Sequence, residues 1–326
     1  MKKIISVILL SGLLLTSACE NTDNNPTGTT DLTDTISTTT NETIEEVVTT
    51  LFYAKVLENQ PETLLVEPEQ GSPVRLSADK VYVTTVEAQI TTSDSSPWLL
   101  SDIKVGDTVK ITFDGNIAES YPAQIHSCTE ITYIEAKYTI DDFWQELEST
   151  ISDETTDSLI NPLEKKNFRD ITPGAVLEET GVQIFKDKDS CISFFTTDQG
   201  FYQVGWFFGG CGIIDAETCD FDADGTKDIM VSSSWGSGIH RSEIYVFNLK
   251  TYEQSCIYNA QVEDDEIYRN SWDLVFQKHS DGDFSVFVAE MKFDEEWDFT
   301  NIEIHPGKQV GTITTEKNAP LWSSVG

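Results

Sequence analysis

The chain has 326 residues, of which 39% are hydrophobic and 10% aromatic, so it is long enough for two folded domains with appendages. Its formal net charge of -35 comes from 56 acidic against 21 basic residues. Such a surface repels nucleic acid and concentrates divalent cations, so we expect no nucleic-acid partner. Alternatively, the acidity only keeps an exported protein soluble.

Residues 1–19 have the features of a lipoprotein signal peptide. Lys2 and Lys3 precede an apolar run, 4–15, which is too short for a comfortable transmembrane helix. The run ends in Leu15-Thr16-Ser17-Ala18-Cys19, which resembles the lipobox of bacterial lipoproteins, although Thr16 stands where a Leu is usual. The resemblance implies that Cys19 is lipidated and anchors the protein to the outer face of a Gram-positive cell membrane. Soluble secretion with a free Cys19 and an uncleaved anchor are the alternatives.

Residues 20–45 are rich in Thr, Asn, Asp, Pro and Gly and hold almost nothing apolar. Such a segment cannot bury enough surface to fold, so we expect a disordered stalk. By random-coil scaling its mean reach is about 25 to 30 Å. The sequence therefore predicts a folded body held off the membrane.

The fold class that we expect for the folded body is mainly β. In residues 46–137 the apolar residues alternate in short runs bounded by turns, and Asp114-Gly115-Asn116 is a strong hairpin signal. Five or six strands at this spacing favour a small OB-like barrel. The strands that we expect are 49–57, 63–66, 80–85, 108–113, 121–126 and 131–135.

The same region resembles a domain of unknown function found in small Gram-positive surface lipoproteins. The residues that carry the resemblance are 52–58, 65–68, 101–107 and 121–125. The resemblance implies an OB-like barrel and brings no catalytic residue with it. Residues 122–126 could contact a ligand, as strand faces and loops of such barrels do. The simpler interpretation is that Ile125 lies in the core and that His126 is a surface or hydrogen-bonded histidine.

A connector, 138–160, follows the first domain. Its residues Phe143, Trp144, Leu147 and Ile151 recur at helical spacing, which predicts a short helix over 141–151. The second domain, 161–326, is again β-rich, either sandwich-like or partial propeller-like. The strands that we expect in it are 181–185, 191–196, 202–208, 228–232, 243–249, 274–278, 284–291 and 311–315.

An acidic loop, Asp220 to Asp228, is the stretch whose residue types and spacing together indicate a chemistry. Asp220, Asp222 and Asp224 alternate so that three carboxylates converge, and Gly225 permits a sharp bend. An EF-hand needs a Glu at the twelfth position, where this chain has Val231. A solvated hairpin without an ion is the alternative.

The spacing D-x-D-x-D-G-x-x-D, followed by an apolar strand, resembles the calcium loop of FG-GAP and VCBS repeats, the blades of integrin-type β-propellers. The resemblance implies calcium as a cofactor, with Asp220, Asp222, Asp224, Asp228 and the carbonyl of Thr226 as ligands. Only one copy of the loop is present in the sequence, whereas a propeller needs four or more blades. A single copy therefore disfavours a full propeller. The simplest expectation for the ion is a structural role, because it would neutralise crowded carboxylates and so stabilise the loop.

The segment 232–242 follows the acidic loop and combines flexible residues with Trp235, His240 and Arg241. It is either a simple hairpin turn, or a ligand loop in which Trp235 stacks and Arg241 pairs with an anion, or a catalytic site with Ser237 and His240. Gly236-Ser237-Gly238 lacks the spacing of a nucleophile elbow, which disfavours the catalytic alternative.

Besides Cys19 the chain holds Cys128, Cys191, Cys211, Cys219 and Cys256. Export permits disulfides, and Cys211 with Cys219 is the nearest pair in sequence. The four His residues are scattered and no CxxC motif occurs, so we do not expect zinc.

The function that we expect is a non-enzymatic binding or envelope-associated module with a structural calcium site, held on the membrane by its lipid and contacting a cell-envelope or protein ligand. The alternative is an extracytoplasmic hydrolase acting on cell-wall or peptide material through 232–242. A cleft that joins His240 to a Ser and a carboxylate would favour the enzyme.

Overall fold

The computed structural model describes residues 49–150, 163–204, 209–263, 265–293, 295, 297–315 and 321–324. The expected signal peptide with Cys19, the stalk and the end of the connector lie outside these ranges. Among the described residues, no helix combines the length and the apolar composition needed to cross a membrane.

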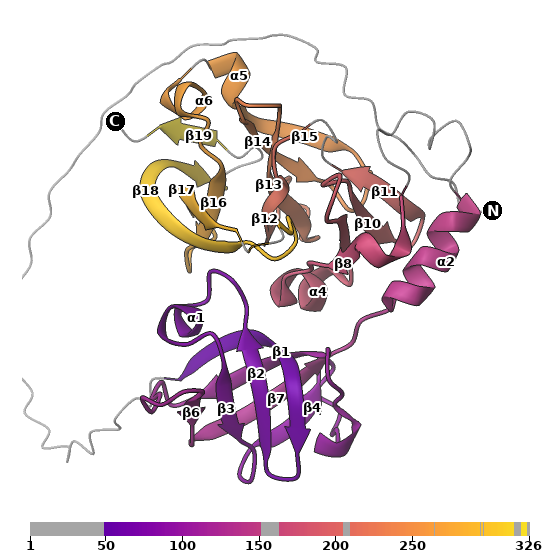
Figure 1. Cartoon of the computed structure of the whole chain (residues 1–326), viewed down its shortest axis with the longest axis vertical. Helices are drawn as coiled ribbons and strands as arrows, with labels where there is room; N and C mark the ends of the chain where they lie inside the picture. The colour runs from indigo at the N-terminus through magenta and orange to yellow at the C-terminus, as the bar shows by residue number, and fades with distance from the viewer. Residues whose placement is uncertain are drawn as a thin grey trace, which may run out of the picture. The chain divides into compact units, whose positions relative to one another are not determined.

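The first part of the described chain forms one seven-stranded sheet, drawn in indigo and violet in Figure 1. Five of its strands pair antiparallel through β1 and β5, while β6 joins β3 and β4 joins β7 in parallel. In pairing order the strands are β4 (Gln89–Thr92), β7 (Cys128–Ile134), β5 (Thr108–Phe113), β1 (Thr50–Gln60), β2 (Thr63–Pro68), β3 (Val81–Thr84) and β6 (Ala123–Ile125). A short helix, α1 (Pro73–Ser77), and a 3-10 turn, η1 (Leu100–Asp102), connect them.

This sheet differs from the expected barrel in two respects. Strands β4 and β6 are its free edges within the described ranges, so the sheet does not close. The turn at Asp114-Gly115-Asn116 is formed, with Asn116 N donating to Asp114 Oδ1 at 3.0 Å, but it does not make a hairpin. Strand β5 before it pairs with β1 and β7, and β6 after it pairs with β3. Local turn chemistry thus predicted the bend and not the partner strand, which long-range packing selects.

The apolar side of the first sheet is its core. The alternation expected for β1 is observed, because Phe52, Ala54 and Val56 are buried while the residues between them are partly exposed. They pack with Ile111, Phe113 and other buried residues of the same cluster.

The connector begins with a helix, α2 (Ile140–Thr150), one residue earlier than expected. At its start Asp142 N donates to Thr139 Oγ1 at 3.1 Å and Thr139 N donates to Asp142 Oδ2 at 3.2 Å, a reciprocal capping pair. Phe143 and Leu147 are fully buried. The helical spacing of apolar residues in the sequence is therefore confirmed as the buried face of α2.

The second part of the described chain forms three four-stranded sheets. Each pairs antiparallel in chain order, as the blade of a propeller does, and Figure 1 shows them passing from pink through orange to yellow. The strands are β8 (Phe168–Asp170), β9 (Ile184–Asp187), β10 (Ser193–Thr197) and β11 (Gly200–Val204); β12 (Gly212–Cys219), β13 (Asp228–Trp235), β14 (Arg241–Phe247) and β15 (Gln254–Asn259); β16 (Leu274–Lys278), β17 (Phe284–Lys292), β18 (Glu303–Thr314) and β19 (Leu321–Ser324).

Short helices lie between these strands. They are η2 (Lys165–Asn167), α4 (Gly174–Thr180), α5 (Ala260–Glu263) and α6 (Glu266–Asn270). The helix α4 ends at Gly181, whose positive φ of 69° suits a left-handed cap.

The middle sheet, β12–β15, buries both of its faces. Ile229 and Val231 of β13 pack in one cluster with Ile184 and Phe195 of the preceding sheet. Met230, between them, packs in another cluster with residues of the following sheet, such as Phe284 and Val286. Alternate side chains of β13 thus pack into two different cores. This explains why residues 229–234 are all apolar or small. The mainly β prediction is confirmed.

Candidate functional site

The acidic loop is the tip of the β12–β13 hairpin. Cys219 and Asp228 are the last paired residues of the two strands, so 220–227 form the connection. Carboxylate oxygens of Asp220, Asp222 and Asp224 all lie within 4.8 Å of one another. Gly225 has a φ of +82°, the left-handed conformation that a glycine adopts without strain.

Backbone N–H groups hold the carboxylates in place. Asp224 N donates to Asp220 Oδ1 at 3.1 Å, and Gly225 N donates to Asp220 Oδ2 at 3.1 Å. Thr226 N donates to Asp224 Oδ1 at 2.8 Å. The loop therefore preorganises three of the predicted ligands around one point.

The turn after β14 reaches the same loop. Asn248 Nδ2 donates to Asp222 Oδ2 at 3.1 Å, and Lys250 Nζ lies 2.8 Å from Asp224 Oδ2. The hydrogen bond from Lys250 lowers the pKa of Asp224 to about 2. Asp224 thus stays ionised at neutral pH, and its ion-pair partner, Lys250, is exposed.

Asp228 lies outside the group of three carboxylates. Its side chain is buried, and its oxygens accept backbone hydrogen bonds from Phe221 N at 3.2 Å and Leu249 N at 3.0 Å. Burial raises its pKa. Asp228 therefore ties the acidic loop to the turn that follows β14. Its predicted role as a metal ligand stays a prediction, as does that of the Thr226 carbonyl.

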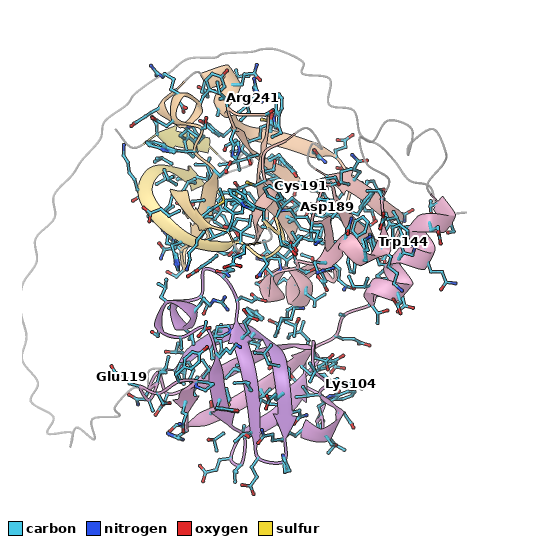
Figure 2. All side chains as sticks on the ribbon, viewed as in Figure 1. Lys104, Glu119, Trp144, Asp189, Cys191 and Arg241 are labelled. Atoms are coloured by element: carbon cyan, nitrogen blue, oxygen red, sulfur yellow. The ribbon has the colours of Figure 1, made fainter. Side chains whose placement is uncertain are left out.

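Trp235 and Arg241 close the base of the β13–β14 hairpin. They are paired in the register, and the Arg241 guanidinium lies 4.8 Å from the centre of the Trp235 ring, a cation–π contact. Both side chains are half-buried, and Arg241 is labelled in Figure 2. One face of Trp235 is therefore occupied by Arg241, which leaves Ile239, 48% exposed, as the apolar residue at the tip.

His240 belongs to a different constellation. Its Nδ1 lies 2.8 Å from Asp273 Oδ2, and this hydrogen bond raises the pKa of His240. Cys211 completes the group, since its sulfur, a ring nitrogen of His240 and a carboxylate oxygen of Asp273 lie within 4.8 Å of one another. Ser237 takes no part in it. The sequence pointed to His240, but nothing in it marked Asp273 as its partner.

The thiol of Cys211 is poorly suited to attack a substrate. It is 1% exposed, and burial, followed by the charge of Asp273, raises its pKa to about 12. Nearby, the fully buried Lys186 donates from Nζ to the carbonyl oxygens of Cys211 at 2.6 Å and Ile213 at 2.9 Å. Burial lowers the pKa of Lys186.

Cys211 and Cys219, the nearest pair of cysteines in the sequence, do not form a disulfide. Both thiols are free, because the two residues lie at opposite ends of the extended strand β12. At about 3.3 Å per residue that strand separates them by roughly 25 Å, whereas a disulfide needs Cα atoms within about 7 Å. Strand β12 was not among the expected strands, so the sequence alone did not show this separation.

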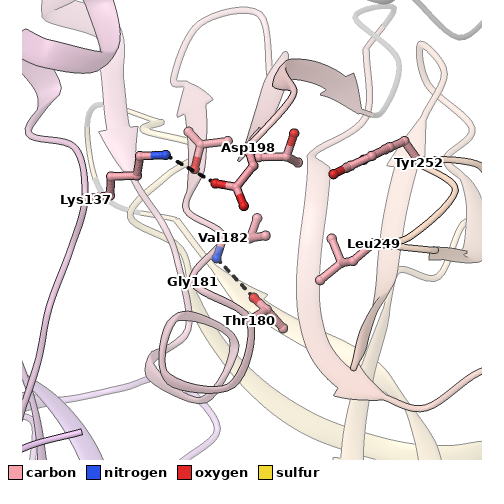
Figure 3. Close-up of a pocket in the computed structure, with 9 residues that line it drawn as sticks. Lys137, Thr180, Gly181, Val182, Asp198, Leu249 and Tyr252 are labelled. Carbon is pink, nitrogen blue, oxygen red and sulfur yellow. Dashed lines mark hydrogen bonds and ion pairs between the residues drawn. The ribbon is translucent and has the colours of Figure 1, made fainter. Parts of the chain in front are cut away.

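A small pocket, lined by Lys137 and by residues of the second part of the chain, lies elsewhere (Figure 3). Its volume is about 100 Å³, room for only a few water molecules. Lys137 reaches across it to Asp198 at 3.5 Å, and Leu249 and Tyr252 form the opposite wall. It contains neither the carboxylate group nor the residues around His240.

Two groups of side chains are therefore the chemically distinctive features of the described chain: the carboxylates of the β12–β13 loop, and Cys211 with His240 and Asp273. Their assignment depends on geometry and residue chemistry alone, because no family model, no curated protein and no solved structure matches this chain.

Proposed function

We propose that this chain is an exported, lipid-anchored surface protein whose second domain is a non-enzymatic binding module stabilised by calcium. The observation that carries the calcium assignment is the convergence of Asp220, Asp222 and Asp224 at the tip of the β12–β13 hairpin. Export and lipidation rest on residues 1–19, and the outer face of a Gram-positive membrane is the location that they imply.

The physical reason for calcium is the crowding of like charges. Carboxylates this close repel one another, and Lys250 offers a single positive charge from an exposed position. Calcium takes six to eight oxygen ligands, and carboxylates, backbone carbonyls and water supply them. An ion here would neutralise the three carboxylates and so stabilise the β12–β13 loop, while it would compete with the Lys250 ammonium for Asp224.

The binding surface that we propose is the hairpin tip at 236–240, next to the Trp235–Arg241 pair, and the ligand is a protein or another envelope component. Loops held by a rigid scaffold commonly carry binding residues. A strand fully buried on both sides, β13, leads directly into this tip.

The hydrolase alternative is favoured by one observation, the hydrogen bond between His240 and Asp273. A histidine oriented by a carboxylate is two-thirds of a catalytic triad. The third member is missing in a usable form, since Cys211 is buried and its pKa is raised, and Ser242 spends its hydroxyl on Trp272 O at 2.5 Å. The non-enzymatic proposal is therefore preferred.

Calcium is expected to raise the melting temperature of the full chain. A ligand present at a hundred times its dissociation constant adds about 2.7 kcal/mol to the free energy of unfolding. Differential scanning calorimetry with calcium and with chelator measures the shift, and the double variant Asp222→Ala/Asp224→Ala should abolish it. A matched control, Glu87→Ala/Glu119→Ala, removes two exposed acids elsewhere and should keep it. Identical melting curves with calcium and with chelator would refute the site.

A further inference from the structure

A second group of potential metal ligands lies apart from the acidic loop. From the placement of Cys211, His240 and Asp273 we infer that they bind a divalent transition-metal ion of the zinc type. This site shares no residue with the calcium loop, so it stands or falls independently of the calcium proposal, although His240 also lies in the proposed binding surface at 236–240.

The three residues come from distant parts of the chain. Cys211 immediately precedes β12, His240 immediately precedes β14, and Asp273 immediately precedes β16. The register pairs Gly212 with Ser234 and Trp235 with Arg241. The starts of β12 and β14 therefore lie at the same end of the middle sheet, next to the end of β13.

Asp273 is brought to this end of the middle sheet by the packing of the next sheet, which begins with β16. Ser232 Oγ donates to Leu274 O at 2.7 Å, and Ser242 Oγ donates to Trp272 O at 2.5 Å. These two bonds hold the backbone on both sides of Asp273. The site is thus built by the stacking of two sheets.

The donor set selects the class of metal. A thiolate, an imidazole and a carboxylate are a mixed sulfur, nitrogen and oxygen set, which suits zinc and its neighbours, whereas calcium and magnesium prefer oxygen alone. Three protein ligands with a fourth position for water is the arrangement of open zinc sites.

The spacing is close to that of a bound ion. Bond lengths of about 2.0 to 2.3 Å place the ligand atoms of a tetrahedral zinc site roughly 3.3 to 3.8 Å apart. The three donor atoms here lie within 4.8 Å of one another, and His240 Nδ1 and Asp273 Oδ2 are already 2.8 Å apart. Binding of an ion would replace the hydrogen bond between His240 and Asp273, so these two donor atoms would move apart by roughly 0.5 to 1 Å, while donor atoms that are farther apart would close by up to about 1 Å. A rotation of the partly exposed His240 ring can supply these shifts.

The surroundings are those of a built site. Cys211 and Asp273 are 1% and 2% exposed, while the His240 side chain is 29% exposed and opens the cluster to solvent. The backbone of Cys211 is fixed on both sides, because its N–H donates to Ser234 Oγ at 3.0 Å and its carbonyl accepts from Lys186. Ser242 Oγ lies 3.4 Å from the second oxygen of Asp273, but its hydrogen is donated to Trp272 O. A metal ion and water can enter at His240, whereas a polymeric substrate cannot reach the buried sulfur.

Cobalt is the probe that tests this site, because a thiolate bound to Co²⁺ gives a charge-transfer band in the near ultraviolet. The full chain, reduced and freed of metal by chelation, is titrated with Co²⁺. We expect the band to saturate at one ion per chain and to disappear when Zn²⁺ displaces cobalt. Cys211→Ser should remove the band, and His240→Ala should weaken cobalt binding at least about tenfold.

Two controls make the result specific. Cys128→Ser removes a thiol of similar burial from the first sheet and should keep the band. Asp222→Ala/Asp224→Ala should keep it as well, because the acidic loop has no sulfur ligand. The inference is overturned if the folded wild type shows no band, or if the band survives in Cys211→Ser. His240→Ala changes only a partly exposed side chain, so unchanged cobalt affinity in that folded variant would also overturn it.

Discussion

At the scale of single residues, burial divides the acidic side chains near the acidic loop into two groups. Asp224 is exposed and paired with Lys250, which keeps its pKa low. Asp215 and Glu217, on the strand that leads to the loop, are instead half-buried, and burial raises their pKa values to about 6 and about 7. The first group suits a cation, while the second makes stability depend on pH.

Glu217 should destabilise the protein at alkaline pH. Its folded-state pKa of about 7 lies above the ordinary value of 4.5, so its contribution to stability is complete below about pH 4.5 and is lost as the pH rises through 7. Glu217→Gln is expected to raise the free energy of unfolding by about 1 to 2 kcal/mol at about pH 8 and to change little at about pH 4.

Urea denaturation at both pH values measures this difference. Glu119→Gln, at an exposed position, is the control and should give no pH-dependent change. Equal effects of Glu217→Gln at both pH values would show that the titration of Glu217 is not linked to folding.

At the scale of elements, α2 shows how a short helix is stabilised by its packing. The ring of Phe143 stacks on Phe185 at 4.1 Å and meets Phe168 and Phe201 edge-on at 5.2 and 5.3 Å. An isolated helix of this length is marginal in water, so this aromatic cluster supplies most of its stability.

Phe143→Ala is therefore expected to destabilise the protein by about 3 to 5 kcal/mol, because it leaves a cavity among four aromatic rings. The loss should be visible as a lower urea midpoint. The exposed Glu148→Ala, on the same helix, should change stability by less than about 0.5 kcal/mol. Similar losses in both variants would contradict the dominant role of the aromatic cluster in holding α2.

Elements also differ in how far the sequence predicted them. The strands β5 and β16 were expected with the bounds that they have, because β5 alternates clearly and β16 begins with the apolar run Leu274-Val275-Phe276 before the turn at 280–283. Strand β12 was not expected, because its apolar residues, Ile213, Ile214 and Ala216, do not alternate, and a bulge between Ile213 and Asp215 shifts its register. Its identity as a strand depends on pairing with β13.

At the scale of the whole molecule, the net charge of -35 and residues 1–19 together set where the protein is expected to work. Strong acidity opposes adhesion to anionic lipid headgroups, so attachment to a membrane requires a covalent or inserted anchor. In the proposed function that anchor is a lipid on Cys19.

In a Gram-positive host, the wild-type chain is expected in the membrane fraction and Cys19→Ser in the medium. Immunoblots of the two fractions measure the distribution. Cys256→Ser, which removes the exposed thiol of β15, should remain in the membrane fraction. Membrane retention of Cys19→Ser would contradict lipidation at this residue.

The sequence by itself determined the β class, most strands with clear alternation, the helix α2 and the convergence of Asp220, Asp222 and Asp224. These features depend on residues close together in the chain, where turn chemistry and periodicity act directly. The tertiary structure alone decided the pairing partners of β5, the diversion of Asp228 to backbone donors, and the meeting of Cys211 and His240 with Asp273. These arrangements join residues that are separated in the chain and are brought together by strand pairing or, for Asp273, by the stacking of two sheets. Residues that meet in this way carry no common spacing in the sequence.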